Sequence, residues 1–334
     1  MKKLSVGIML LASCICFVSC SENAKVRRKI KKVDVANVEI NRYDKALFDV
    51  KDIDFREGIK ALQKEFRPFL NADLEDPQNI SQLFDFVNDT FVQQLHRTTI
   101  DMYPELDKTE KDLTEAFRHI KYYFPDWSQP EVFTFVSGLY DEQPVQYNGS
   151  ELILALDLYL GDDFKGYRQV GFPLFRIKRM QQAYLVADVM KEIASVEFIK
   201  PEPYKHLLDK MIADGKLLYL LDCFLPRVAD EFKIGFSQNE LKWCKNHNSE
   251  MWAYLLEHQL LYANDPIVVN KFINDGPFTA AFQNESPARA SLWVGWQIVR
   301  SYMKNNPETS PQELINLSDA TQMLVRSKYK PGRF

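Results

Sequence analysis

Glycine is scarce in this sequence, with 12 glycines among 334 residues. Glycine-dependent signatures of several enzyme classes are also missing: there is no Gly-x-Ser-x-Gly nucleophile turn, no phosphate-binding glycine loop and no dinucleotide-binding fingerprint. Long stretches of helical hydrophobic periodicity occur instead. Few glycines and much helical periodicity together predict a predominantly helical protein.

Cysteine is sparse too, and beyond the N-terminal segment the chain has only Cys223 and Cys244. An oxidising compartment would allow them to pair, but two cysteines form no disulfide framework in a chain this long. Because both have apolar or aromatic neighbours, we predict buried free thiols rather than a bridge.

Histidines are few and badly spaced for a metal site. No two of the five histidines lie four residues apart, the spacing with which one helix binds zinc. His247 and His258 are separated by about 16 Å on a continuous helix, too far to share an ion. We therefore predict no metal site and no cofactor, and interpret these two histidines as surface or capping residues.

An excess of positive charge is also missing, since the formal net charge is −4. A mildly acidic chain gives no reason to expect a nucleic-acid partner. The basic residues cluster at one place, between residues 27 and 32.

The one long hydrophobic run lies at the N-terminus. Two lysines precede an apolar run over residues 4–18, which is the pattern of a secretory signal and is shorter than the roughly 20 residues of a membrane-spanning helix. The run closes on Ser19-Cys20, which resembles the lipobox of bacterial lipoproteins and makes Cys20 the predicted lipidation site. Cleavage before Cys14 and an ordinary cleaved signal are the alternatives.

This interpretation divides the chain into three parts. We predict a signal peptide over residues 1–19, a lipidated basic tether over 20–33 and a single globular domain over 34–334. Acyl chains on Cys20 would anchor the protein to a membrane without spanning it. The basic tether would either contact anionic headgroups or keep the linker extended by charge repulsion.

The hydrophobic pattern of the domain predicts a fold of class α+β, with a small β-sheet among many helices. Helical spacing over residues 175–327 makes the last part almost entirely helical, with capping boxes at Ser237 and Ser310. The remaining predicted elements are a short strand within 33–40, helices over 55–69, 80–95 and 113–124, and strands over 131–138, 145–150 and 151–161, the last two joined by an Asn-Gly turn.

Carboxylates inside hydrophobic runs mark candidate sites. Asp157, Asp188 and Asp222 each interrupt such a run, and a buried carboxylate needs a cationic or hydrogen-bonding partner. Glu192 lies four residues after Asp188, so both occupy one helix face and could supply two acid groups or two oxygen ligands. The alternative is structural, with these carboxylates pairing with Arg176, Arg179 or Arg300 to hold helices together.

The stretch SLWVGWQIVRSYMKNNP, over residues 291–307, is apolar almost all round a helical wheel. Such a helix is normally buried, and Gly295 then indicates a close helix contact. Arg300 needs an acceptor, for which one of the three aspartates is the natural candidate. Trp296 and Arg300 would otherwise belong to a ligand platform or polar cavity.

Several blocks of this sequence resemble the gliding-motility lipoprotein GldB family over residues 38–331. The blocks are RYDKALF, YFPD, LDLYLGDD, GFPLF, GKLLYLLDCFLP, IGFSQNELKWC, VGWQIVRSYMKNNP and SKYKP. The resemblance implies a periplasm-facing envelope lipoprotein, in the outer membrane rather than the inner, with partners in the motility or secretion apparatus. It implies no biochemical activity.

A fainter similarity connects the chain to zinc-peptidase-like proteins that carry a His-Glu-x-x-His helix. The corresponding residues are DVMKE (188–192), followed by Asp214-Gly215, so both histidines are missing and the scaffold would be degenerate. Two hypotheses remain open: a non-catalytic scaffold or binding component, and a hydrolase or a peptide- or glycan-binding protein with a site between the sheet and the C-terminal helices.

Overall fold

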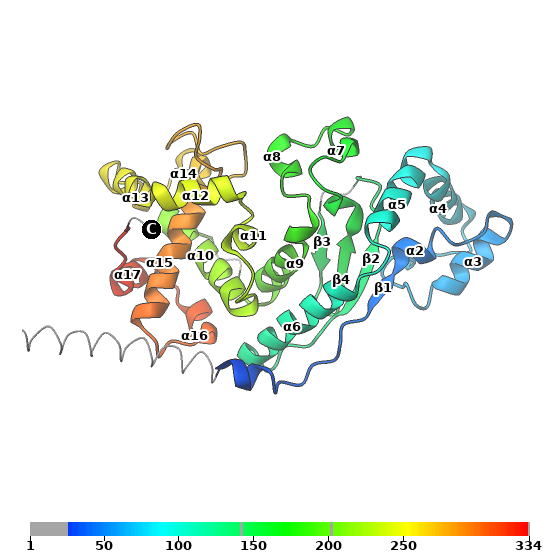
Figure 1. Ribbon diagram of the computed structural model, residues 1–334, viewed down its shortest axis with the longest axis horizontal. Coiled ribbons are helices and arrows are strands. Elements are labelled where there is room, and N and C mark those ends of the chain that lie inside the picture. Colours follow the sequence, from blue (N-terminus) through cyan, green and yellow to red (C-terminus); the bar gives the residue numbers. More distant parts are fainter. Residues whose placement is uncertain (1–25, 141–142, 201–202, 333–334) are drawn as a thin grey trace, which may run out of the picture.

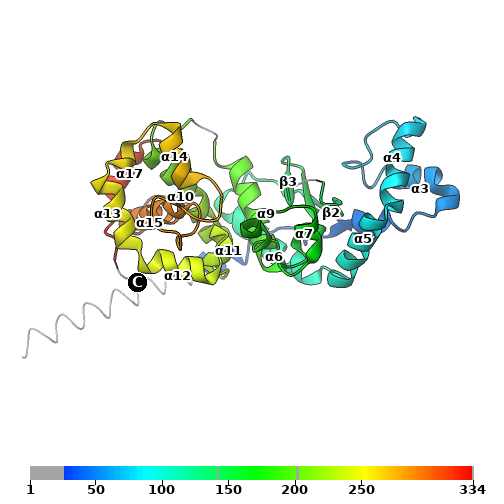
Figure 2. The same cartoon turned by 90° about the horizontal axis from the view of Figure 1, so that it is seen from above.

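A small sheet lies between two unequal sets of helices in the computed structural model of the protein, which describes residues 26–140, 143–200 and 203–332 (Figures 1 and 2). The four strands have the order β1-β2-β4-β3, with β1–β2 and β2–β4 parallel and β3–β4 antiparallel. Their bounds are β1 Ile40–Arg42, β2 Glu131–Phe135, β3 Val145–Tyr147 and β4 Glu151–Ala155. The predicted Asn-Gly turn closes the β3–β4 hairpin, where Gly149 has φ +97°.

The two faces of the sheet pack against different helices because side chains alternate along each strand. Val132 and Leu152 belong to the larger hydrophobic core, whereas Phe133 and Ile153 pack into a smaller one. The smaller core is formed with α2 (Tyr43–Ala46), α3 (Phe55–Leu62) and α4 (Pro77–Asn88). Helices therefore cover both faces of the sheet, and these three form one end of the elongated molecule (Figure 2).

The larger core extends from the sheet into a helical C-terminal half. The helices that follow the first sheet-covering group are α5 Thr90–Met102, α6 Asp107–Tyr123, α7 Lys165–Gln169, α8 Leu174–Ile177, α9 Gln182–Glu197, α10 Leu207–Phe224, α11 Asp230–Ile234, α12 Gln238–Asn246, α13 Asn248–Glu257, α14 Pro266–Ile273, α15 Ala290–Asn305, α16 Pro311–Asn316 and α17 Ala320–Ser327. This arrangement confirms the predicted helical α+β class. The capping boxes at Ser237 and Ser310 are present as well.

The crossing of α10 and α15 organises the C-terminal half. A Cβ atom added to Gly295 would lie 2.0 Å from the Met211 carbonyl oxygen, and one added to Gly215 would lie 2.5 Å from the Gly295 carbonyl oxygen. Residues from Ala290 to Val299 are all buried. The predictions of a buried helix and of a close contact at Gly295 are both confirmed, because only glycine lets the two backbones approach this closely.

Several predicted elements have different boundaries. The predicted helix over 80–95 is two helices, because the backbone of Asp89 is extended rather than helical. The Asp89 side chain accepts hydrogen bonds from the amides of Phe91 and Val92 at the start of α5. The helix predicted over 55–69 ends at Leu62, although Phe66 is still buried in the smaller core. β4 ends at Ala155 rather than 161, where a 3₁₀ turn begins.

The predictions for the N-terminus concern a signal peptide, a lipidation site and a basic tether. Cys20, the signal peptide and most of the tether lie outside the described residues. Within the described ranges, no helix has both the length and the apolar character needed to cross a bilayer.

Candidate functional site

Asp157 is held by the backbone and the side chain of Ser137, and none of the other candidate residues bonds to its carboxylate. Its Oδ1 accepts from the Ser137 amide at 2.9 Å, and its Oδ2 accepts from the Ser137 hydroxyl at 2.9 Å. Complete burial raises the pKa of Asp157 to about 6, although the bonds from Ser137 oppose the rise. The carboxyl group anchors the turn after β2 to the 3₁₀ segment after β4, and its contacts are those of a structural residue.

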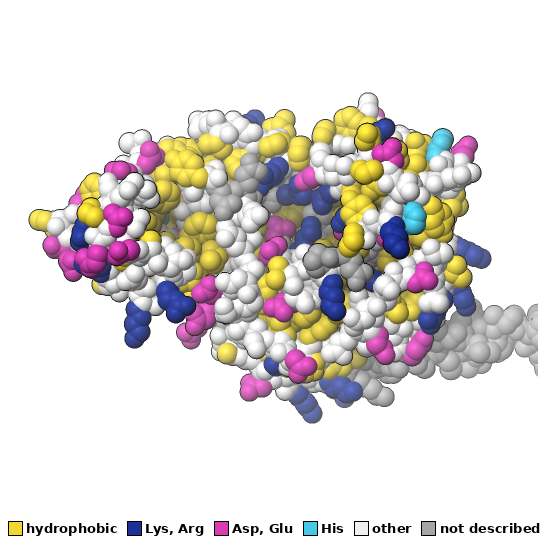
Figure 3. All heavy atoms as spheres, turned by 180° about the vertical axis from the view of Figure 1, so that it is seen from behind, with side chains coloured by type: hydrophobic (Ala, Val, Ile, Leu, Met, Phe, Trp, Pro, Cys, Tyr) yellow, Lys and Arg dark blue, Asp and Glu magenta, His cyan; other side chains and the backbone are white. Residues whose placement is uncertain are grey.

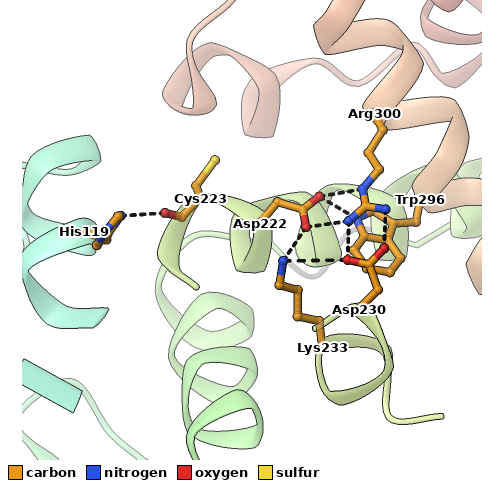
Figure 4. Close-up of polar contacts among 7 residues, drawn as sticks. All are labelled: His119, Asp222, Cys223, Asp230, Lys233, Trp296 and Arg300. Atoms are coloured by element: carbon orange, nitrogen blue, oxygen red, sulfur yellow. Dashed lines mark hydrogen bonds and ion pairs between the residues drawn. The ribbon is translucent and has the colours of Figure 1, made fainter. Parts of the chain in front are cut away.

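Asp222, Trp296 and Arg300 meet in a charge cluster that joins three helices (Figure 4). The acceptor of Arg300 is Asp222, one of the three candidate aspartates. The Arg300 Nε and Nη2 atoms each donate to Asp222 at 2.7 Å. The Trp296 indole donates to Asp222 at 3.0 Å, and the Arg300 guanidinium lies 3.6 Å from the centroid of the same indole ring.

Two residues that the sequence did not single out complete this cluster. Asp230 accepts two further bonds from Arg300 at 2.8 Å, and Lys233 donates to Asp222 at 2.9 Å. Burial opposes the charge of Arg300, but the bonds to Asp230 and Asp222 raise its pKa overall. Since each charged group has an opposite partner, the cluster fixes α10, α11 and α15 together. The indole contacts of Trp296 favour a structural role, and its ligand-platform interpretation stays an alternative prediction.

His119 extends these contacts to the sheet side of the molecule. Its Nδ1 atom lies 2.9 Å from the Cys223 carbonyl oxygen, which joins α6 to the end of α10 (Figure 4). Cys223 and Cys244 are free thiols, as predicted, with Cys244 buried and Cys223 half-buried.

Asp188 and Glu192 line a cleft of about 380 Å³ beside α9. They face it together with Lys191 and with Arg176 and Arg179, which come from α8 and the segment after it. A smaller adjoining pocket shares Arg179 and adds Asp275 and Arg289. In Figure 3 basic side chains gather inside a hollow on the rear face, with acidic side chains beside them.

Like charges crowd this cleft. Desolvation and, after it, the charge of Arg289 lower the pKa of Lys191 to about 8, although the charge of Asp188 opposes them. The pKa of Arg289 is also lowered, first by burial and then by the charge of Arg179. Desolvation raises the pKa of Asp188, which accepts a bond from the Tyr159 hydroxyl at 3.1 Å. The cleft therefore holds partly desolvated charges of both signs.

One acidic residue holds the two arginines in place. Asp275 forms ion pairs with Arg179 and with Arg289, whose Nε lies 3.5 Å from the Asp275 Oδ1. That distance is not a hydrogen bond, and the buried Arg289 Nε has no acceptor among the residues that the structure describes. Asp188 is thus not bonded to Arg176, Arg179 or Arg300 as the structural alternative supposed; the Tyr159 hydroxyl is its partner.

The sequence signals for this cleft were incomplete. Asp188 and Glu192 stood out as acidic residues in an apolar helix, but Lys191 between them looked like an ordinary helix-surface lysine. Arg289 has φ +57° and lies in a loop before α15, where no periodic pattern marks it. Only the folded chain brings these residues to Arg179.

The residues related to the zinc-peptidase-like pattern lie on two adjacent helices. Residues 188–192 are on α9 and Asp214 is on α10, where Lys210 pairs with it. Within the described ranges, no group of three or more His, Cys, Asp or Glu side chains is arranged to hold a metal ion. The relation to that scaffold stays a prediction.

The fold and these sites define a class of protein: a helical α+β protein with a charged cleft and a separate structural ion-pair cluster. The family of the gliding motility protein GldB matches residues 23–331, so the chain belongs to this family. Membership implies a lipoprotein of the cell envelope that is associated with gliding motility. No curated protein and no solved structure matches the chain.

Proposed function

We propose that the protein is a lipid-anchored, periplasm-facing component of the motility or secretion machinery that binds a partner without catalysing a reaction. Family membership supports the association with gliding motility. The lipobox-like end of the N-terminal apolar run supports anchoring through acyl chains on Cys20. The resemblance to this family of envelope lipoproteins supports a periplasm-facing position, with the outer membrane preferred to the inner.

The charge pattern of the cleft carries the binding part of this proposal. A metal-dependent hydrolase would use the carboxylates of Asp188 and Glu192 to attract a cation. Here Lys191 lies between them in the sequence of α9, and Arg176 and Arg179 line the same cleft. Three cations beside two carboxylates repel a metal ion and attract the acidic or polar groups of a partner.

Site-specific crosslinking tests the proposal. Leu174 on α8 is 62% exposed and lies two residues from Arg176, so a photoreactive residue placed there samples the mouth of the cleft. The matched control carries the same residue at Val325 on α17, which is 71% exposed. In living cells with the Cys20 anchor intact, we expect Leu174 to crosslink to an identified motility or secretion component and Val325 not to do so.

Three results would contradict the proposal. Equal crosslinking from both positions would show that the cleft has no special role in partner contact. A Cys20→Ala variant that fractionates with the membrane as well as the original chain would refute lipid anchoring at that residue. Purified protein with one equivalent of a tightly bound transition metal would favour the hydrolase hypothesis instead.

A further inference from the structure

We infer that the cleft beside α9 binds the carboxylate of a peptide-like ligand, with Lys191, Arg179 and Arg289 receiving the negative charge. This inference rests on the proposed binding function and names the chemistry of its ligand. It needs no catalytic step and no metal ion.

Like charges crowd together at this cleft. The charge of Arg179 lowers the pKa of both Lys191 and Arg289, the charge of Arg289 lowers that of Lys191, and Asp275 forms ion pairs only with the two arginines. Among the described residues, no carboxylate lies within ion-pair distance of the Lys191 Nζ atom, although Asp188 acts on it through space. An anion placed between these cations would relieve their repulsion.

Arg289 has a buried N–H donor that no hydrogen bond uses. The buried Nε of Arg289 has no hydrogen-bond acceptor among the described residues. A buried guanidinium donor without an acceptor is costly, and the side chain is held in place by Asp275 and by a left-handed backbone at φ +57°. The Nε atom itself is closed to solvent, but a carboxylate beside this guanidinium would offset the cost through its charge.

The balance of charge selects a single negative charge. When all are ionised, the two pockets have one positive charge in excess: the basic residues are Arg176, Lys178, Arg179, Lys191 and Arg289, and the acidic ones are Asp188, Glu192, Glu240 and Asp275. A phosphate dianion would face strong repulsion from those carboxylates, whereas a carboxylate adds one charge. Asp188 and Glu192 also offer acceptors to N–H groups next to that carboxylate, as in a peptide.

The lining of the cleft sets the body of the ligand. Apolar side chains contribute much of its wall, among them Val145, Leu158, Met180 and Leu217. Its volume of about 380 Å³ suits one or two residues of a peptide. A carboxylate attached to a small apolar residue therefore matches both the charges and the wall.

Binding of short peptides to the purified folded protein tests the inference by calorimetry. The first probe is acetyl-Ala-Leu with a free carboxylate, and its control is the same peptide as the C-terminal amide. Acetyl-Glu-Leu-amide and acetyl-Gln-Leu-amide form a second pair, which separates a side-chain carboxylate from a C-terminal one. Octanoate and inorganic phosphate test a carboxylate without N–H groups and a dianion.

We expect at least one of the two acidic peptides to bind at least about tenfold more tightly than the uncharged control of its pair. Octanoate and phosphate should both bind more weakly than that acidic peptide. Lys191→Met should weaken the acidic peptide by about tenfold or more. Lys304→Met, at an exposed lysine on α15 that lines neither pocket, should leave it unchanged. A ligand-induced decrease in the labelling of Lys191 by an amine-reactive reagent would place the peptide in the cleft.

Equal affinity for the acidic and amidated peptides would overturn the inference, and so would phosphate binding more tightly than either acid. Failure of every probe to bind at 5 mM, roughly the weakest affinity that a specific site would show, would overturn it as well. Crosslinking from Leu174 to an envelope component would survive these results, so the proposed function and the ligand chemistry fail separately.

Discussion

Replacing Lys191 by methionine should stabilise the protein. The folded environment lowers the pKa of Lys191 from 10.5 to about 8, and each tenfold loss of proton affinity corresponds to about 1.4 kcal/mol. The charged lysine therefore costs the folded state at most about 3 kcal/mol near neutral pH. The ammonium group can reach toward the open cleft while its aliphatic stem stays buried, which relieves part of this cost. We therefore expect the replacement to recover about 1–2 kcal/mol.

The pH dependence of this gain gives the reasoning a second check. A folded-state pKa below the unfolded value means that the cost is complete below pH 8 and disappears as the pH rises toward 10.5. Urea unfolding followed by tryptophan fluorescence should show the gain of Lys191→Met at pH 7 and a smaller gain at pH 9.5. Lys178→Met is the control, with an expected change within about 0.5 kcal/mol. A neutral or destabilising Lys191→Met at pH 7 would refute the reasoning.

The remaining predictions concern the packing and the structural carboxylates. Gly295→Ala should destabilise by about 3 kcal/mol or more, because its Cβ would meet the Met211 carbonyl at 2.0 Å, whereas Gly276→Ala has open space and should change the free energy of unfolding little; equal urea midpoints would contradict this. Arg300→Met should cost about 2–4 kcal/mol by leaving two carboxylates without their guanidinium, and a thermal melt within 2 °C, or roughly 0.5 kcal/mol, of the original would count against it. Since burial raises the pKa of Asp157 to about 6, its contribution to stability should fall as pH rises from about 4 to 6, and Asp157→Asn should remove that dependence in urea titrations; an unchanged profile would be inconsistent with it.

Hydrophobic periodicity predicted the class of the fold because helices such as α3, α5 and α6 each have one clear apolar face. It also predicted the close approach at Gly295, since a glycine in a helix that is apolar all round has few other uses. The pattern could not show the break at Asp89, where hydrogen bonds from the first amides of α5 to the Asp89 carboxylate outweigh continuous helical spacing.

The candidate site was only partly visible in the sequence, for a different reason. A buried aspartate indicates that a partner exists but not which one, so Asp222 was one of three candidate acceptors for Arg300, whereas Asp230 and Lys233 were not recognised. The cleft depends on Lys191 and Arg289, which lie on separate segments and look like surface residues in isolation. Their importance comes from mutual repulsion, which depends on distance in the folded chain.

The contact between α10 and α15 also determines when the protein can finish folding. Gly215 lies in the middle of the chain and Gly295 near its end, so the closest helix contact joins segments made at very different times. Until residues 290–305 are available, the apolar groove of α10 has no helix to cover it. The C-terminal half must therefore remain incomplete until α15 has been made. A chain shortened before α15 would present this groove to other proteins.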